Sequence, residues 1–106
     1  MSDNQWRKIF DRIGEAASWE MLAEEAAELS AAAIKVSRIL RGDNPTRTDY
    51  ETAVAKAVEE MSDTQNALEV LDVGLLAKEN RLCRRVWESQ PGKMTRWYQS
   101  LFGGDA

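Results

Sequence analysis

Apolar positions recur every three or four residues along most of the chain, which predicts a protein built almost entirely of helices. No segment shows the sustained alternation of apolar and polar residues that is typical of a strand. Glycine, proline and capping residues divide the pattern into four predicted helices. These helices cover residues 3–13, 18–41, 49 to 72–74, and 75–89.

The predicted helix ends follow from local signals. Ser18 is the expected N-cap of the second helix, and Gly42 is its expected C-terminal stop. Thr48 and Glu51 have the spacing of a capping box, which opens the third helix. The Gln-Pro-Gly sequence at 90–92 is expected to end the fourth helix, because proline interrupts a helix interior.

The second and third predicted helices are each about 24 residues, or roughly 36 Å, long. Their apolar arcs consist of Leu22, Ala26, Leu29, Ala33, Val36 and Leu40 in the second helix, and Val54, Ala57, Val58, Met61, Leu68 and Leu75 in the third. A chain of 106 residues has too little else to cover two such arcs. The sequence therefore predicts an all-α bundle of about four helices, with a long antiparallel pair, completed by a homodimer or tetramer.

Composition removes several classes of chemistry and partner. Histidine is absent and only one cysteine occurs, which excludes His-ligated zinc and Ser-His or Cys-His nucleophiles. A net charge of −4 argues against binding to a nucleic-acid polymer. No apolar run approaches the roughly 20 residues that span a bilayer, and the first residues lack the apolar stretch of a signal peptide. We therefore expect a cytoplasmic protein without a membrane partner.

Carboxylates recur in one pattern on the two long helices, as Glu-Glu-x-x-Glu in the second and Glu-Glu-x-x-Asp in the third. Residues three apart share a helix face, so Glu25 pairs with Glu28, and Glu60 pairs with Asp63. Glu28 lies 17 residues before Pro45, and Glu60 lies 15 residues after it. In an antiparallel hairpin with its turn at Pro45, the two pairs therefore face each other at about the same height.

Four facing carboxylates repel one another, and a cation between them would relieve that repulsion. The donor set is oxygen alone, which favours Mg²⁺, with Mn²⁺ as a substitute, over zinc or copper. Such an ion would reverse the local charge, polarise a phosphoryl group and orient a water whose proton a carboxylate could accept. Acidic residues at this spacing also occur on ordinary solvated helix faces, so both interpretations remain open.

The two motifs resemble the signature of the MazG-like all-α nucleoside triphosphate pyrophosphohydrolases. The matching stretches are WEMLAEEAAELSAAAIKVSRILRGDNPT and AVEEMSDTQNALEVL, about half of the chain, with a 30-residue spacer at the long end for the family. The resemblance implies an oligomeric helical bundle that uses Mg²⁺ to cleave a (deoxy)nucleoside triphosphate between its α and β phosphates. It implies a role in clearing unwanted nucleotides. By motif position, the metal-ligand and catalytic residues are Glu25, Glu28, Glu60 and Asp63, with Glu24 and Glu59 as further candidates.

Three more residues are candidates for substrate binding. Lys35 could hold a phosphate, Asn66 could bind sugar or base, and Trp19 could stack on a base. Ion pairing, solvation and packing explain the same residues without a substrate. A rival function is a non-enzymatic adaptor that binds another protein. We expect residues 1–90 to form the helical domain, and residues 91–106 to form an aromatic tail that packs on a partner chain.

Overall fold

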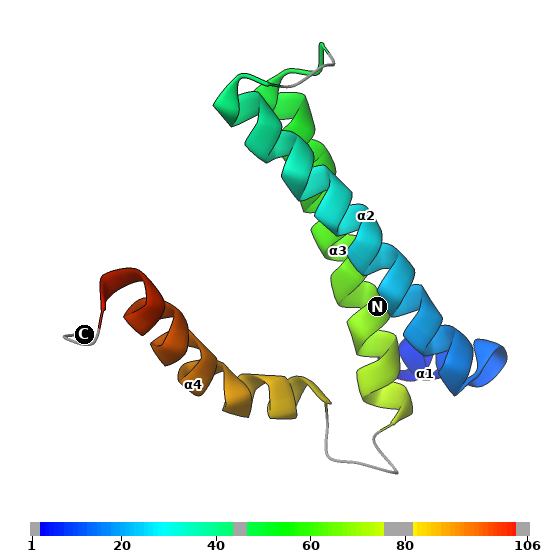
Figure 1. The fold of residues 1–106 in the computed structure, drawn as a ribbon. Helices are drawn as coiled ribbons and strands as arrows, with labels where there is room; N and C mark the ends of the chain where they lie inside the picture. The colour runs from blue at the N-terminus through cyan, green and yellow to red at the C-terminus, as the bar shows by residue number, and fades with distance from the viewer. Residues whose placement is uncertain (1–2, 44–46, 76–81, 104–106) are drawn as a thin grey trace.

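Four helices form the described part of the chain, which comprises residues 3–43, 47–75 and 82–103 of a computed structural model. They are α1 (Asp3–Ile13), α2 (Glu15–Arg41), α3 (Tyr50–Gly74) and α4 (Leu82–Phe102). Figure 1 shows α2 and α3 side by side and antiparallel, with α1 at one end of the pair and α4 directed away from it. The predicted all-α fold with a long helix pair is therefore confirmed. None of the described helices is both long and apolar enough to cross a membrane.

α1 ends at Ile13 as predicted, but α2 begins at Glu15, directly after Gly14 and about one turn earlier than the sequence suggested. Gly14 has a φ of 89°, which residues with a side chain rarely adopt, and this conformation turns the chain from α1 into α2. The prediction that Ser18 caps α2 is wrong. Ser18 lies fully buried inside the helix, where its hydroxyl donates to the Gly14 carbonyl at 2.7 Å. A serine inside the first turn can bond backward in this way, so it resembles a cap in sequence.

The two ends of the long pair that face the connecting segment are capped differently. Gly42 ends α2 as predicted, in the left-handed conformation with a φ of 77°. The N-cap of α3 is Asp49 and not Thr48, because the Asp49 carboxylate accepts from the Thr52 backbone N–H at 2.7 Å. That hydrogen bond also lowers the pKa of Asp49. Residues 44–46 of the predicted turn lie outside the described residues.

The fourth helix departs most from the sequence prediction. It runs through Pro91 and Gly92 to Phe102, so the expected end at 90–92 is wrong. Residues 76–81, at the predicted start of that helix, lie outside the described residues. Proline removes one backbone hydrogen bond, but α4 is solvent-exposed around Pro91, so water can satisfy the freed carbonyl. Thr95 donates its hydroxyl to the Pro91 carbonyl at 3.0 Å in the following turn.

Small residues bring α2 and α3 close together. Ala53, Ala57 and Ala67 of α3 are buried, as is Ala32 of α2, and Leu71 is fully buried near the end of α3. The sequence placed the larger side chains of α3 in the packed face, and for two of them this prediction is wrong. Val58 and Met61 are 54% and 53% exposed. The alanine face packs instead because it lets the two backbones approach more closely than branched side chains allow.

Much apolar surface remains exposed on the single chain. The largest exposed fractions belong to side chains of α2 and α4, namely Leu40, Trp87, Trp97, Leu101 and Phe102. The radius of gyration is 17.4 Å, against about 13 Å for a compact domain of 100 residues. As the sequence indicated, the chain alone does not cover the apolar faces of its long helices.

α1 is held against the end of α3 by one hydrogen bond and one close packing contact. The Arg7 guanidinium donates to the Val73 carbonyl at 2.8 Å. The ring of Phe10 lies directly against Gly74, where an added Cβ would overlap the ring atoms. Glycine is therefore required at position 74 for α1 to lie in this place.

We expect Gly74→Ala to destabilise the fold by about 1–3 kcal/mol, the usual cost of overpacking. The ring of Phe10 must move as a whole, because the overlap includes the atom at its base and not only its tip. Chemical denaturation of a double-mutant cycle with Phe10→Ala measures the effect. In the Phe10→Ala background, Gly74→Ala should cost much less. An equal cost in both backgrounds would contradict this contact.

Candidate metal centre

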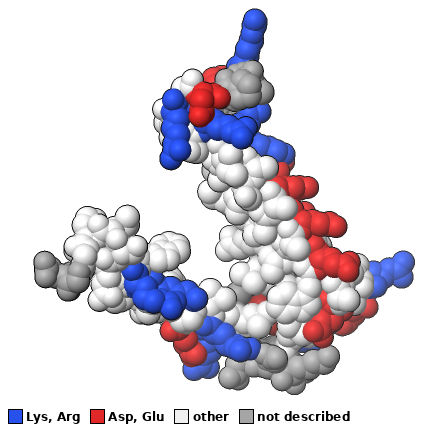
Figure 2. Space-filling view, in the orientation of Figure 1, with Lys and Arg blue, Asp and Glu red and all other residues white. Residues whose placement is uncertain are grey.

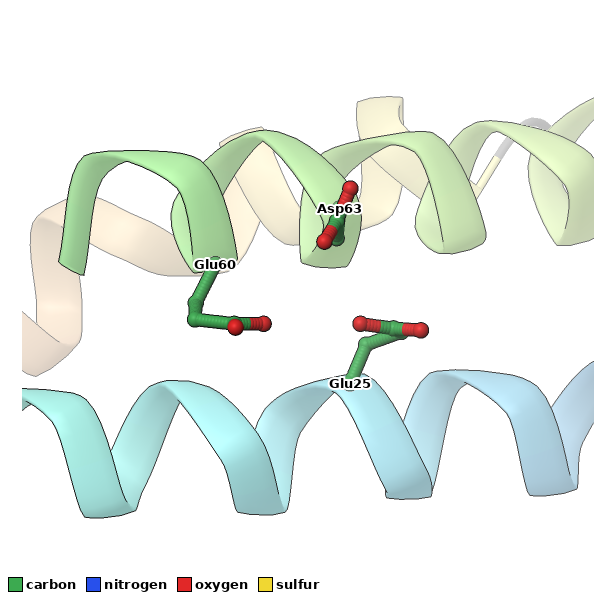
Figure 3. Close-up of side chains that lie close together, drawn as sticks. All are labelled: Glu25, Glu60 and Asp63. Carbon is green, nitrogen blue, oxygen red and sulfur yellow. The ribbon is translucent and has the colours of Figure 1, made fainter. Parts of the chain in front are cut away.

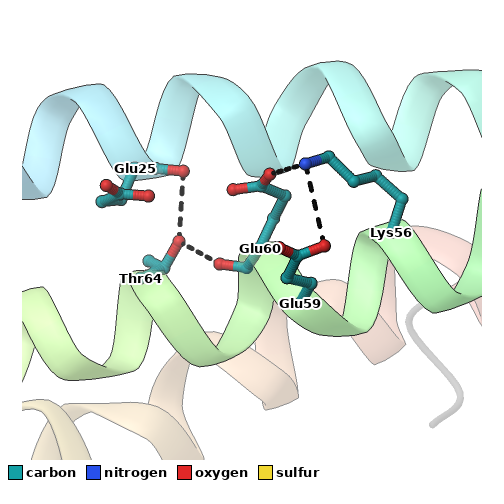
Figure 4. A network of polar contacts seen from close by, with 5 residues as sticks. All are labelled: Glu25, Lys56, Glu59, Glu60 and Thr64. Atoms are coloured by element: carbon teal, nitrogen blue, oxygen red, sulfur yellow. Dashed lines mark hydrogen bonds and ion pairs between the residues drawn. The ribbon is translucent and has the colours of Figure 1, made fainter.

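A threonine of α3 fixes the register between the two long helices. The Thr64 hydroxyl lies 2.8 Å from the Glu60 carbonyl one turn earlier and 3.1 Å from the Glu25 carbonyl of α2 (Figure 4). This contact sets residue 25 opposite residues 60–64. The two acidic motifs therefore face each other, at the relative height that their equal distances from the turn predicted.

Three of the predicted carboxylates converge on one point. One carboxylate oxygen from each of Glu25, Glu60 and Asp63 lies within 4.8 Å of the other two. Figure 3 shows Glu60 and Glu25 extending toward each other from α3 and α2, with Asp63 one turn further along α3. Glu60 is buried, Glu25 is half-buried and Asp63 is exposed, so the cluster opens to solvent on one side.

Two oxygens of this carboxylate cluster have no hydrogen-bond donor. Oε2 of Glu60 and Oε2 of Glu25 are buried and accept no hydrogen bond from the protein. The Glu60 side chain is only 5% exposed. A buried carboxylate oxygen without a donor costs considerable free energy, and a cation bound between the helices would supply the missing partner. The cluster therefore has the donor chemistry of a site for a hard cation.

Lys56 partly compensates the charge of the cluster, and the sequence analysis missed it. Its ammonium group lies 2.8 Å from Oε1 of Glu60 and 3.8 Å from Oε2 of Glu59 (Figure 4). The hydrogen bond from Lys56 lowers the pKa of Glu60, although burial acts in the opposite direction. The same bond raises the pKa of Lys56. The available signal was the spacing of four residues between Lys56 and Glu60.

Glu28 lies at the edge of the cluster, and its pKa is shifted in the opposite direction from that of Glu60. The charge of Glu25 raises the pKa of Glu28, and so does its contact with the Glu60 side chain. The same contact contributes to lowering the pKa of Glu60. Glu28 is exposed, which leaves its carboxyl accessible to water.

A hollow of about 410 Å³ continues from the cluster toward the turn end of the helix pair. Glu28 and Glu60 line it together with Lys35 and Lys56. The structure therefore brings Lys35 to the same depression as two of the predicted carboxylates. Two ammonium groups beside carboxylates can hold an anionic ligand whose other charges are neutralised by a metal ion.

The remaining candidates are more dispersed. Asn66 lines a second pocket on the opposite side of the cluster. Glu24 is exposed and is not part of the carboxylate cluster, and Glu59 reaches only Lys56. The structure does not bring Trp19 to either pocket: this side chain is 45% exposed, and its indole N–H donates to Glu15 at 3.4 Å.

Comparisons with known proteins find no matching protein-family model, no matching curated protein and no matching solved structure. The fold and the carboxylate cluster define an all-α protein with an acidic site between two antiparallel helices. Any narrower class depends on the chemistry of the site and on the resemblance of its two motifs.

Proposed function

We propose that the protein is a Mg²⁺-dependent nucleoside triphosphate pyrophosphohydrolase that releases a nucleoside monophosphate and pyrophosphate. One observation carries the proposal: both acidic motifs supply carboxylates to one cluster that contains buried oxygens without a donor. The site has no histidine or thiol, so its ligand set is that of a magnesium or manganese site.

Glu25, Glu60 and Asp63 would hold the metal, because their oxygens already lie within 4.8 Å of one another. Mg²⁺ held by these residues would supply the positive charge that offsets the phosphate charge during cleavage. Thr64 keeps the two helices in the register that this ligand set requires. Glu24 and Glu59 have no place in the ligand set of this proposal.

Glu28 is the residue we assign as general base for the attacking water. Its pKa is raised by the neighbouring charge of Glu25, which makes it a better proton acceptor than an ordinary glutamate. It is also exposed, so water can reach it. Water attacks the α phosphorus, its proton passes to Glu28, and pyrophosphate leaves toward Lys35 and Lys56 in the adjoining hollow. The choice of the α–β bond comes from the MazG-like resemblance of the motifs.

The proposal includes self-association into a dimer or tetramer. Its support is the apolar surface that the single chain leaves exposed on α2, α3 and α4. The same surface favours the rival function, a helical adaptor that binds a different protein. The exposed stretch of α4 at residues 84–102, with Trp87 at 74% and Trp97 at 67%, is the observation on which that rival depends.

A panel of deoxynucleoside triphosphates incubated with Mg²⁺ tests the proposal, with products separated by chromatography. We expect monophosphate and pyrophosphate, and no product when EDTA is present. Diphosphate and phosphate would show cleavage of the other anhydride bond and would overturn the proposed reaction. The absence of turnover with both Mg²⁺ and Mn²⁺ would favour the adaptor.

A further inference from the structure

A pocket of about 200 Å³ lies between α1, α2 and α3, directly beside the carboxylate cluster. Glu25 and Asp63 line both this pocket and the cluster, so a ligand in the pocket would continue into the cluster without a break. Its remaining surface combines apolar walls with polar groups, among them Trp6, Met21, Asn66 and Val70.

The indole N–H of Trp6 is a hydrogen-bond donor without an acceptor. Its Nε1 is buried and has no acceptor in the protein, although an indole N–H can act only as a donor. Buried indole groups ordinarily find a partner, since an unpaired donor away from water is unfavourable. Trp6 lines the pocket, so an acceptor atom on a ligand held there would supply the partner.

The pocket is suited to a small flat group. Pockets of about 300–1,000 Å³ hold drug-sized ligands, and this smaller one has room for a single flat base. Met21 and Val70 supply apolar walls, against which the faces of a flat ring can pack. The Asn66 amide offers one acceptor and two donors at the rim. These features match the faces and the edge of a heteroaromatic ring that carries a carbonyl oxygen.

Three chemically distinct regions follow one another along the helix pair. The pocket with Asn66 comes first, the cluster with Asp63 and Glu60 follows, and the hollow with Lys56 lies beyond it toward the turn. Figure 2 shows acidic side chains gathered along one edge of the molecule and basic ones near the turn. A nucleotide has the same order of parts, from base through the α phosphate to the outer phosphates.

From this order we infer that the pocket binds a nucleobase that carries a ring carbonyl, with the Trp6 N–H donating to that carbonyl and Asn66 contacting the polar edge. Cytosine, uracil, thymine and guanine carry such a carbonyl, whereas adenine does not. The inference rests on the proposed function for the position of the phosphates. It adds the class of base and gives Trp6 a role in binding it.

Nuclear magnetic resonance of the wild-type protein gives the direct test, because it requires no turnover. Deoxycytidine monophosphate is titrated in while the tryptophan indole N–H signals are followed, with Trp6→Phe used to assign the Trp6 signal. We expect a saturable shift of the Trp6 signal and none of the Trp19 signal, whose N–H is bonded to Glu15. Deoxyadenosine monophosphate, whose base has no ring carbonyl, should bind at least about tenfold more weakly. Equal binding of the two nucleotides, or an unmoved Trp6 signal, would overturn the inference.

Trp6→Phe removes the donor and keeps an aromatic ring, so it isolates the hydrogen bond. We expect binding of deoxycytidine monophosphate to weaken about fivefold, the equivalent of one ordinary hydrogen bond. The KM for deoxycytidine triphosphate should rise by about the same factor. A fall in kcat for every substrate would instead mean that Trp6 supports the cluster.

The two proposals fail in different ways. If triphosphates are hydrolysed but the Trp6 signal does not respond to a pyrimidine, the base binds elsewhere and the pocket inference is wrong. If no triphosphate is hydrolysed but the Trp6 signal shifts and saturates, the pocket inference stands and the proposed hydrolase does not. 2-Deoxyribose 5-phosphate serves as the control ligand, since it lacks the base and should leave the Trp6 signal in place.

Discussion

Replacing Glu60 with glutamine should abolish the proposed metal-dependent turnover while the helices remain intact. Glu60 is the most buried carboxylate of the cluster, and its side chain is only 5% exposed. Glutamine keeps the shape but loses the charge and one ligating oxygen. Since loss of a group that only supports a metal ligand typically costs 10–100-fold, loss of a ligand should reduce kcat/KM by at least about 100-fold. Steady-state hydrolysis of a deoxynucleoside triphosphate measures the effect.

Glu59→Gln is the matched control for this experiment. Glu59 is adjacent in sequence and also contacts Lys56, but it lies outside the carboxylate cluster and is 65% exposed. We expect this variant to keep nearly full activity. Circular dichroism should show the same helix content for both variants, because Glu60→Gln relieves a buried charge. Full activity in Glu60→Gln would remove the cluster from the mechanism.

Millimolar Mg²⁺ should raise the melting temperature of the wild-type protein by more than about 10 °C. The cluster joins two helices that separate on unfolding, so the ion binds the folded chain and not the unfolded one. At a concentration of about 100 times Kd, such linkage adds about 2.7 kcal/mol to the free energy of unfolding. For a chain of this size, each kcal/mol corresponds to about 4–8 °C. Differential scanning calorimetry measures the shift.

The rise in melting temperature caused by Mg²⁺ should be larger at neutral pH than at acid pH. The raised pKa of Glu28 means that its ionised form is less favourable in the folded chain, so metal-free stability falls as pH rises from 4.5 through the raised value. Protons compete with Mg²⁺ for the same region, so the metal-induced shift should be largest at neutral pH and small below 4.5.

The Lys56–Glu60 pair contributes a separate pH dependence. The pKa of Glu60 is lowered, so its pairing with Lys56 stabilises the fold above 4.5 and is lost as pH falls through the lowered value. Because Lys56 is 59% exposed, solvent weakens this contribution.

Sodium chloride at matched ionic strength is the control for the melting experiment with Mg²⁺. An equal shift with sodium chloride would mean that screening alone stabilises the fold and that no specific ion binds.

The register of the acidic motifs was predictable from sequence because it depends on spacing alone. Residues three apart share a helix face, and equal distances from one turn give equal heights in an antiparallel pair. The structure brings together Glu25, Glu60 and Asp63 as this arithmetic requires. The hydroxyl of Thr64, which fixes the alignment, was not singled out, since a threonine inside a helix has no distinctive pattern.

The sequence predicted a helix end correctly where the backbone conformation of a single residue determines it. It failed where the surroundings of the residue in the fold determine whether the helix ends. Gly42 ends α2 because its left-handed conformation is local. Ser18 was misread because serine near a helix start is usually an N-cap that accepts from a backbone N–H, whereas here its hydroxyl donates back to the Gly14 carbonyl. Pro91 was misread because an exposed helix can lose one backbone bond to water, and only the three-dimensional surroundings reveal that exposure.

The pocket beside the cluster was beyond sequence reasoning for a different reason. Trp6 and Asn66 meet only because α1 packs across the end of the long pair, and that placement depends on the contact between Phe10 and Gly74. Neither the pair Trp6 and Asn66 nor the pair Phe10 and Gly74 has a spacing in the sequence that would indicate contact between its members. The sequence instead favoured Trp19, which is close to the acidic motif along the chain but lies at an exposed position on α2.

The buried alanines of α3 carry a consequence for ion selectivity. Ala57 and Ala67 flank Glu60 along the packed face and determine how closely the two backbones approach. The methyl groups of these alanines therefore set the width of the gap, and they would set the radius of a cation held by the three carboxylates as proposed. Discrimination between a small ion such as Mg²⁺ and a larger one such as Ca²⁺ would then be adjustable by side-chain volume alone, with every ligand left in place.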